Sequence, residues 1–294
     1  MFRLVLLVLA ETTAGAQAVR LAGSLAARHG AGFAVQHVSG PLSQEGGCVL
    51  HLPGEDVLAA RRAEVESLCR QSMPPGLTAD VLLSAGFVHV EALKTARLLG
   101  PDLLVLGGLD EAERCRQELT GSAAAAALLI AAAAPCPVLV LPTFVDNAPE
   151  PSVPFQRILA ATDLSASVDG VLGVAGRIAA REGAALRAIH ALPLPPGPAA
   201  GLAQALAKAR EHLVYLGRGL PLANPMGVAV REGDPAVEIQ KDARESQADL
   251  LVLSSGSYGQ DASVPGRVLA GARCPVLFVG PQALSAQPPT AAKG

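Results

Sequence analysis

The chain contains no tryptophan, and aromatic residues make up only 3% of its 294 residues. It therefore has few rings on which the bases of a single-stranded nucleic acid could stack. The formal net charge of -3 shows no basic excess, so neither a nucleic-acid backbone nor an anionic membrane surface is indicated as a partner. The half of the sequence that is hydrophobic must instead build cores from aliphatic side chains.

The cysteines do not form the pairs that disulfide frameworks or zinc sites use. There are five of them and no Cys-x-x-Cys motif, which argues against both kinds of site. We predict buried free thiols in a reducing compartment, and hence a cytoplasmic protein. The five are Cys48, Cys69, Cys115, Cys136 and Cys274.

Long apolar runs of the kind that cross a membrane are also missing. The run Leu4–Ala10 resembles the core of a signal peptide, but it has a counterpart inside the chain at Arg157–Ala161, and an internal copy cannot be a targeting signal. The Ala-rich run at 123–134 is shorter than the roughly 20 residues that span a bilayer. We interpret the first two runs as strands and the third as a buried helix.

What the sequence does contain is an internal repeat. The segment Pro101–Gly108 returns as Ala248–Ser255, and Pro135–Val140 returns as Arg273–Phe278. A repeat of this length indicates two copies of one domain. Any site is therefore either present twice or kept in one copy and lost in the other.

Each copy alternates short apolar runs with amphipathic stretches, the pattern of a parallel sheet covered by helices. In the second copy we predict a helix over Ser165–Glu182 and a fourth strand over Asp249–Leu253. The predicted organisation is a first domain at 1–142, a Pro-rich linker at 143–154, a second domain at 155–281 and a disordered tail at 282–294.

The spacing between equivalent positions changes along the chain. Gly30 and Gly183 lie 153 residues apart, Asp102 and Asp249 lie 147 apart, and Cys136 and Cys274 lie 138 apart. The second copy has thus lost six residues before its third strand and nine more between its fourth and fifth strands. The second loss falls in a loop that follows a parallel strand, where such sheets bind ligands.

Four segments of the second copy, taken in order, resemble the universal stress protein family. The resemblance covers most of both copies and implies an α/β fold. It implies two tandem five-stranded parallel sheets with helices on both faces, packed as an internal pseudo-dimer through their last strands. The segments are Ala161–Ser165, Glu232–Ala236, Ala248–Leu253 and Cys274–Leu277.

Many members of that family bind ATP or a related nucleotide. Their marks are an Asp at the end of the first strand and a Gly-x-x-Gly-x9-Gly-Ser/Thr loop after the fourth. Glycines let backbone N–H groups approach phosphate, and the Gly-Ser pair opens a helix whose N-terminus attracts anions. In this chain the aspartate occurs in the second half, and the glycines occur in the first.

The first half keeps Gly107, Gly108 and the pair Gly121-Ser122, but Asp110 or Glu111 stands where the middle glycine belongs. Leu9 or Ala10 takes the place of the aspartate. Because the loop also carries more acids than arginines, we expect the first half not to bind ATP.

The second half keeps Asp163, but Ser254–Ser257 replaces the opening glycines and the loop is shortened. Asp163 could equally cap the following helix, and the serines could equally form a polar turn. Any nucleotide site is predicted here, and we predict no catalytic residues and no metal ligands. The candidate residues are Thr162, Asp163, Ser165, Ser254, Ser255, Gly256 and Ser263.

His37 and His190 fall at matching positions, 153 residues apart, which suggests a shared packing or hydrogen-bonding role. The histidines show no metal-ligand spacing, and no Gly-x-Ser-x-Gly elbow is present.

Three functions are compatible with the sequence. The favoured one is a regulatory stress-response binding protein that is not a turnover enzyme and binds ATP, AMP or another adenine nucleotide weakly at most. The others are an ATP-dependent switch with slow hydrolysis and a small-molecule enzyme on the same frame. As partners we expect an adenine nucleotide and an unidentified protein, without nucleic acid or membrane. The expected assembly is a monomer or a homodimer.

Overall fold

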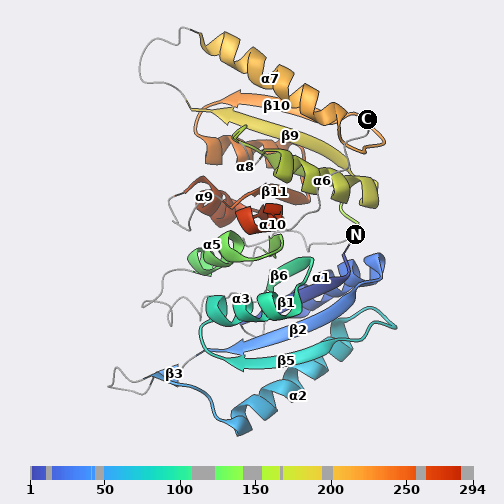
Figure 1. The fold of residues 1–294 in the computed structure, drawn as a ribbon, viewed down its shortest axis with the longest axis vertical. Coiled ribbons are helices and arrows are strands. Elements are labelled where there is room, and N and C mark those ends of the chain that lie inside the picture. Colours follow the sequence, from blue (N-terminus) through green and yellow to red (C-terminus); the bar gives the residue numbers. More distant parts are fainter. Residues whose placement is uncertain are drawn as a thin grey trace.

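The protein forms one long mixed sheet with helices on both faces (Figure 1). This computed structural model describes residues 2–10, 15–40, 42–43, 50–107, 123–141, 154–165, 168–193, 201–255 and 263–285. The predicted linker, apart from its last residue, lies outside these ranges.

The two halves contribute five strands each, in the same spatial order. From the middle of the sheet outward, the first half has β7 (Val138–Val140), β6 (Leu103–Gly107), β1 (Leu4–Leu9), β2 (Gly32–Ser39) and β5 (Asp80–Ala85). The second half has β12 (Val276–Val279), β11 (Leu250–Ser254), β8 (Arg157–Ala161), β9 (Ala185–Leu192) and β10 (Gly227–Glu232). All neighbours within a half are parallel.

The halves join through their last strands. Strands β7 and β12 pair antiparallel, with Leu139 opposite Leu277. These two leucines are 138 residues apart and therefore equivalent, so a pseudo-twofold axis passes between them. The predicted pseudo-dimer through the last strands is confirmed, and the two parallel sheets merge into a single sheet of ten strands. The pairing removes two apolar edges that would otherwise be exposed.

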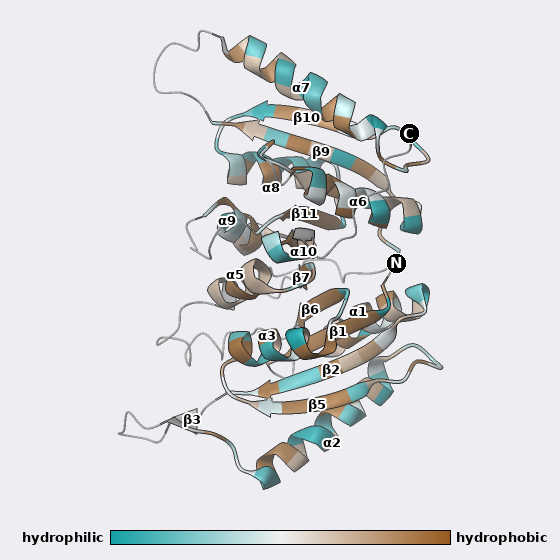
Figure 2. Ribbon diagram, viewed as in Figure 1, coloured by the Kyte–Doolittle hydropathy of each residue, from teal (hydrophilic) through white to brown (hydrophobic). Residues whose placement is uncertain are grey.

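Helices cover both faces of the sheet, and the inner strands β1, β6 and β11 are accordingly apolar on both sides (Figure 2). One face packs against α1 (Gly15–His29), α2 (Glu55–Ser72), α6 (Val168–Glu182) and α7 (Leu202–Arg218). The other packs against α3 (Val88–Leu99), α5 (Ala123–Ala133), α8 (Pro235–Glu245) and α9 (Val264–Gly271). Strand β1 shows the alternation: Val5, Leu7 and Leu9 belong to the first core, and Leu6 and Val8 to the second.

The repeated Asp-Leu-Leu motif joins the strands at their amino ends. The Asp102 carboxylate accepts hydrogen bonds from the backbone N–H groups of Arg3, at 2.6 Å, and Leu4, at 3.1 Å. Asp249 accepts the equivalent bonds from the backbone N–H groups of Gln156, at 2.8 Å, and Arg157, at 2.9 Å. The repeat therefore conserves a structural contact between the first and fourth strands of each half.

Three elements differ from the sequence prediction. Helix α6 begins at Val168 and not at Ser165, because residues 162–165 form a turn with Leu164 at φ 59°, outside helical geometry. A short helix, α10 (Pro281–Ser285), occupies the start of the expected disordered tail, and residues 286–294 lie beyond the described part of the chain. The antiparallel pair β3 (Leu42–Ser43) and β4 (Leu50–His51) was not expected.

Candidate ligand site at the carboxyl ends of β8 and β11

The predicted site lies where the strand order of the second half reverses. The chain runs from β8 outward to β9 and β10, then returns to β11 on the other side of β8. Open α/β sheets bind ligands in the crevice at such a switch point, outside the carboxyl ends of the strands. Thr162 and Asp163 directly follow β8, and Ser254 ends β11. The fold thus brings these candidates, about 90 residues apart in the chain, to one edge.

Short-range hydrogen bonds hold the turn after β8. The Leu164 N–H donates to Thr162 Oγ1 at 3.0 Å, and the Ser165 N–H donates to Asp163 Oδ1 at 2.9 Å. Leu164 has a φ of 59°, a left-handed conformation that costs a branched, non-glycine residue energy. The turn is therefore held in one geometry by its own side chains.

His190 fixes the same turn from the neighbouring strand. Its Nδ1 lies 2.8 Å from the Thr162 carbonyl oxygen, and because a carbonyl can only accept, Nδ1 carries the proton. The Thr162 N–H in turn donates to the Ile189 carbonyl at 3.0 Å. His190 is thus part of the site's scaffold, which sequence reasoning had not placed there. The signal that could have found it was its exact match with His37.

The matching histidine of the first half makes a different contact. His37 is buried on β2, and its Nδ1 lies 3.4 Å from the Ser39 hydroxyl. Burial lowers the pKa of His37; nearby Arg61 lowers it further, while Glu64 acts in the opposite direction. Both histidines are buried and hydrogen-bonded. Burial and a hydrogen bond are common to both positions, as predicted, whereas the bonded partner differs.

Asp163 is exposed and available to a ligand. The alternative that it caps the following helix is wrong in its simple form, because its carboxylate accepts from Ser165, three residues before α6 begins. The hydrogen bond from Ser165 engages one carboxylate oxygen, Oδ1. An exposed acid on a rigid turn at a switch point suits recognition of a ligand's hydrogen-bond donors.

The remaining candidates lie at the end of β11 or after it. Ser255 is buried, and its N–H donates to the Val279 carbonyl at 3.3 Å. Ser263 caps α9, accepting from the Gly266 N–H at 3.3 Å. Gly256 lies outside the described residues. Ser254 is half-buried at the end of β11 and directly follows Leu253, which lies opposite Ala161 at the end of β8.

The first half has no aspartate at the position that corresponds to Asp163. Leu4 lies opposite Gly32 in the first half, and Arg157 lies opposite Ala185 in the second. The second pair follows the first at a spacing of 153 residues along the chain. The same spacing makes Ala10 the counterpart of Asp163. Leu9, the counterpart of Thr162, is fully buried.

Gly107 serves packing in this structure. A Cβ atom added to it would lie 2.3 Å from Ala18 Cβ, on helix α1, a distance that real Cβ atoms do not reach. The glycine is therefore required for the close approach of β6 and α1. Its presence in the sequence is explained without a phosphate contact.

We expect Gly107→Ala to lower the free energy of unfolding by about 1–2 kcal/mol, because overpacking displaces β6 or α1. Urea denaturation measures this. Gly173→Ala in α6 is the control: its nearest neighbour is the flexible end of Arg177 at 3.5 Å, so stability should stay level or rise. Equal effects of the two changes would contradict the packing role of Gly107.

The described residues also bear on metal binding, membrane insertion and the state of the cysteine thiols. No group of histidine, cysteine and acidic side chains among them could hold a metal ion, and no described helix is long and apolar enough to cross a membrane. Cys69, Cys136 and Cys274 are buried free thiols, as predicted, and Cys48 and Cys115 lie outside the described residues. Burial raises the pKa of Cys136 and of Cys274 to about 12, so both are protonated and unreactive at neutral pH.

Comparison with known proteins identifies the second half. The model of the universal stress protein family matches residues 154–280. The second half is a universal stress protein domain. No curated protein matches the chain.

Solved structures extend the likeness in fold to the whole chain. A universal stress protein from Archaeoglobus fulgidus DSM 4304 is 19% identical with a TM-score of 0.63, covering 94% of this chain and 96% of that chain. A functionally unknown protein from Pseudomonas aeruginosa PAO1 is 17% identical with a TM-score of 0.62, covering 97% and 95%. The first half therefore has the universal stress protein fold, and the chain is a tandem arrangement of it.

A shorter structure matches less well. A universal stress protein in complex with cAMP is 25% identical with a TM-score of 0.34, covering 42% of this chain and 97% of that chain.

Proposed function

We propose that this tandem universal stress protein is a cytoplasmic, regulatory stress-response protein that binds one adenine nucleotide per chain, weakly, in its second half. The observation that carries the proposal is the asymmetry of the two switch points. Asp163 stands exposed on a rigid turn in the second half, and Ala10 stands at the same place in the first. A site retained in one copy only is what a binding protein with one sensing half and one supporting half requires.

The chemistry of the turn favours a base and ribose over a triphosphate. The carboxylate of Asp163 can accept hydrogen bonds from ribose hydroxyls or an exocyclic amine, whereas it repels phosphate. The segment between β11 and β12 is nine residues shorter than the segment between β6 and β7, which removes backbone N–H groups that could surround phosphates. AMP or adenosine should therefore bind at least as well as ATP.

No residue is proposed as catalytic. Asp163 and His190 are the titratable groups that the structure places at the turn, and His190 is engaged with a backbone carbonyl. We therefore propose a binding protein and not a turnover enzyme. The second candidate is an ATP-dependent switch, which the retained Asp163 would also suit.

Isothermal titration calorimetry with AMP, adenosine and ATP, with and without magnesium, tests the proposal. We expect a stoichiometry of one per chain, a Kd for AMP no higher than that for ATP, and no magnesium dependence. A strong, magnesium-dependent preference for ATP would instead establish the switch. Binding of two nucleotides per chain would show that the first half also has a working site.

We expect Asp163→Ala to raise the Kd for AMP about tenfold or more, since a hydrogen bond to a charged group contributes about 1.5–3 kcal/mol. The control is Asp169→Ala, which removes an exposed acid from the first turn of α6. That change should leave the Kd within about twofold. An unchanged Kd in Asp163→Ala would remove Asp163 from the site.

A further inference from the structure

The central surfaces of the two halves are nearly copies of one another. Eight apolar residues line a residual void of about 10 Å³ between the halves, too small for more than one water molecule. They form four pairs of equivalent residues: Phe2 with Phe155, Leu25 with Ile178, Leu103 with Leu250, and Leu139 with Leu277. Because the pairs match in size and polarity, these contacts do not distinguish an unlike half from a like half of a second chain.

One pair at the same place does not match. Helices α1 and α6 are both 15 residues long and end at equivalent positions, α1 at His29 and α6 at Glu182. The two side chains meet across the axis, with His29 Nε2 3.2 Å from Glu182 Oε1. Their side chains are 2% and 1% exposed. Equivalent positions of the two halves therefore carry a base, His29, and an acid, Glu182, and both side chains are shielded from water.

Arg28 completes the contact from the first half. Its Nε donates to Glu182 Oε2 at 3.1 Å, and its Nη2 lies 3.0 Å from the same oxygen. The edge of the His29 ring also packs against Phe2, with centroids 4.7 Å apart. Both carboxylate oxygens of Glu182 are thus engaged by groups of the other half.

A like pair could not reproduce this arrangement. Two second halves would bring Glu182 against a second Glu182, and two carboxylates at this separation cannot both stay ionised without a large cost. Two first halves would bring His29 against a second His29, with no carboxylate to accept from the imidazoles or from Arg28. Each like pairing leaves buried polar groups poorly matched.

We propose that His29, Arg28 and Glu182 make the central surface of each half specific for the unlike half, so that the chain closes on itself and disfavours pairing with the like half of a second copy. The matched apolar contacts stabilise any pairing of the halves, whereas the contact of His29 and Arg28 with Glu182 stabilises only the pairing of unlike halves. Specificity of this kind needs an element that penalises the wrong pairing.

Exchanging the two residues should preserve the contact, because the flanking residues are also matched. Arg181 precedes Glu182 as Arg28 precedes His29. In H29E/E182H the new acid at position 29 would face an imidazole at position 182 and the guanidinium of Arg181. The exchanged pair is then a mirror image of the natural one.

Thermal unfolding of the full chain at neutral pH tests the proposal with three variants. We expect E182H and H29E, which create the two like pairs, each to lower Tm by about 5–15 °C. We expect H29E/E182H to recover most of that loss. Recovery in the double variant is the result that a mere loss of packing would not give.

An exposed pair provides the control. Arg61 and Glu64 on α2 are about half exposed, and α2 packs against the outermost strand, β5, so R61E should shift Tm by no more than about 2 °C. Two outcomes would overturn the proposal: single variants as stable as the natural protein, or a double variant no more stable than the worse single variant. If E182H does not fold, H29E/E182H alone tests the proposal. It is then expected to fold with nearly the Tm of the natural protein, and failure to do so would overturn the proposal.

Discussion

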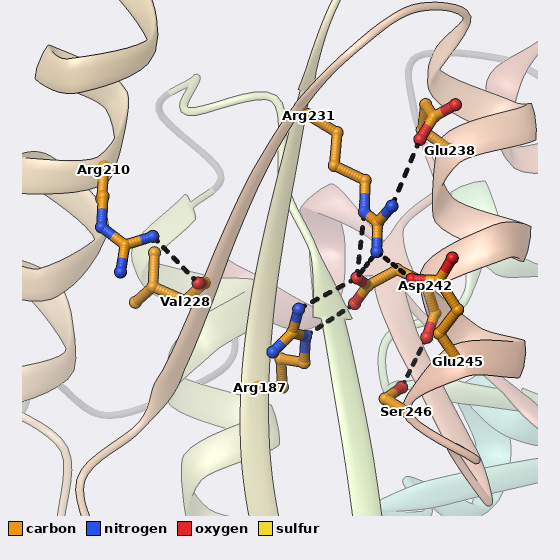
Figure 3. A network of polar contacts seen from close by, with 8 residues as sticks. All are labelled: Arg187, Arg210, Val228, Arg231, Glu238, Asp242, Glu245 and Ser246. Carbon is orange, nitrogen blue, oxygen red and sulfur yellow. Dashed lines mark hydrogen bonds and ion pairs between the residues drawn. The ribbon is translucent and has the colours of Figure 1, made fainter.

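Asp242→Ala is expected to lower the free energy of unfolding by about 3 kcal/mol. Asp242 lies on α8 and is completely buried. Arg187 on β9 donates to its two oxygens at 2.8 and 3.1 Å, and Arg231 on β10 donates at 3.0 and 2.6 Å (Figure 3). Removing the acid leaves two guanidinium groups facing a partly buried cavity without their common partner.

The expected value stands at the lower end for a buried ion pair because water and neighbours compensate in part. The Arg187 side chain is 40% exposed. Arg231 keeps its contacts with Glu238, at 3.7 Å, and with Glu245. Urea denaturation measures the loss. Glu245→Ala is the control, since Glu245 is 52% exposed and its removal should cost less than about 1 kcal/mol.

The effect of Asp242 should disappear in acid. Burial raises the pKa of Asp242, but the hydrogen bonds from Arg187 and Arg231 outweigh it, so the pKa lies below its ordinary value. The stabilisation is therefore full above the unfolded pKa, near 3.9, and is lost as the pH falls through the lower folded pKa. Parallel pH profiles of the natural protein and Asp242→Ala, differing by a constant amount down to pH 2, would contradict this assignment.

Gly280→Ala is expected to cost about 2–3 kcal/mol, because no room exists for one added carbon. A Cβ atom at Gly280, directly after β12, would lie 2.3 Å from the backbone carbonyl oxygen of Ala131 on α5. Backbone cannot rotate away as a side chain could. The strand end and the helix belong to different halves, so the change should separate the halves where they meet.

Thermal and urea unfolding measure the cost of Gly280→Ala. The control is Gly219→Ala, where the nearest atom is the Leu216 carbonyl oxygen at an ordinary 3.6 Å, and where φ of -82° suits any residue. The control should change stability by less than about 0.5 kcal/mol. A Gly280→Ala variant as stable as this control would show that the halves are not in close contact there.

The sequence alone determined the repeat, the fold class and the pairing of the last strands. These follow from local signals: apolar runs that recur at a fixed spacing form equivalent strands, and two apolar terminal strands need a cover. The family resemblance also located the candidate turn after β8, because Asp163 stands where the family has an Asp at the end of its first strand. The sequence did not determine where α6 begins, since the left-handed Leu164 is stabilised by Thr162 and not by a glycine.

Only the tertiary structure decided what the individual residues do. Strand register was needed to assign Ala10 to the place of Asp163, where the sequence left Leu9 and Ala10 as alternatives. Packing explained Gly107, which the sequence could connect only with phosphate. Contacts between residues distant in the chain, such as His29 with Glu182, leave no local pattern, because their chemistry depends on a neighbour that folding alone brings within reach.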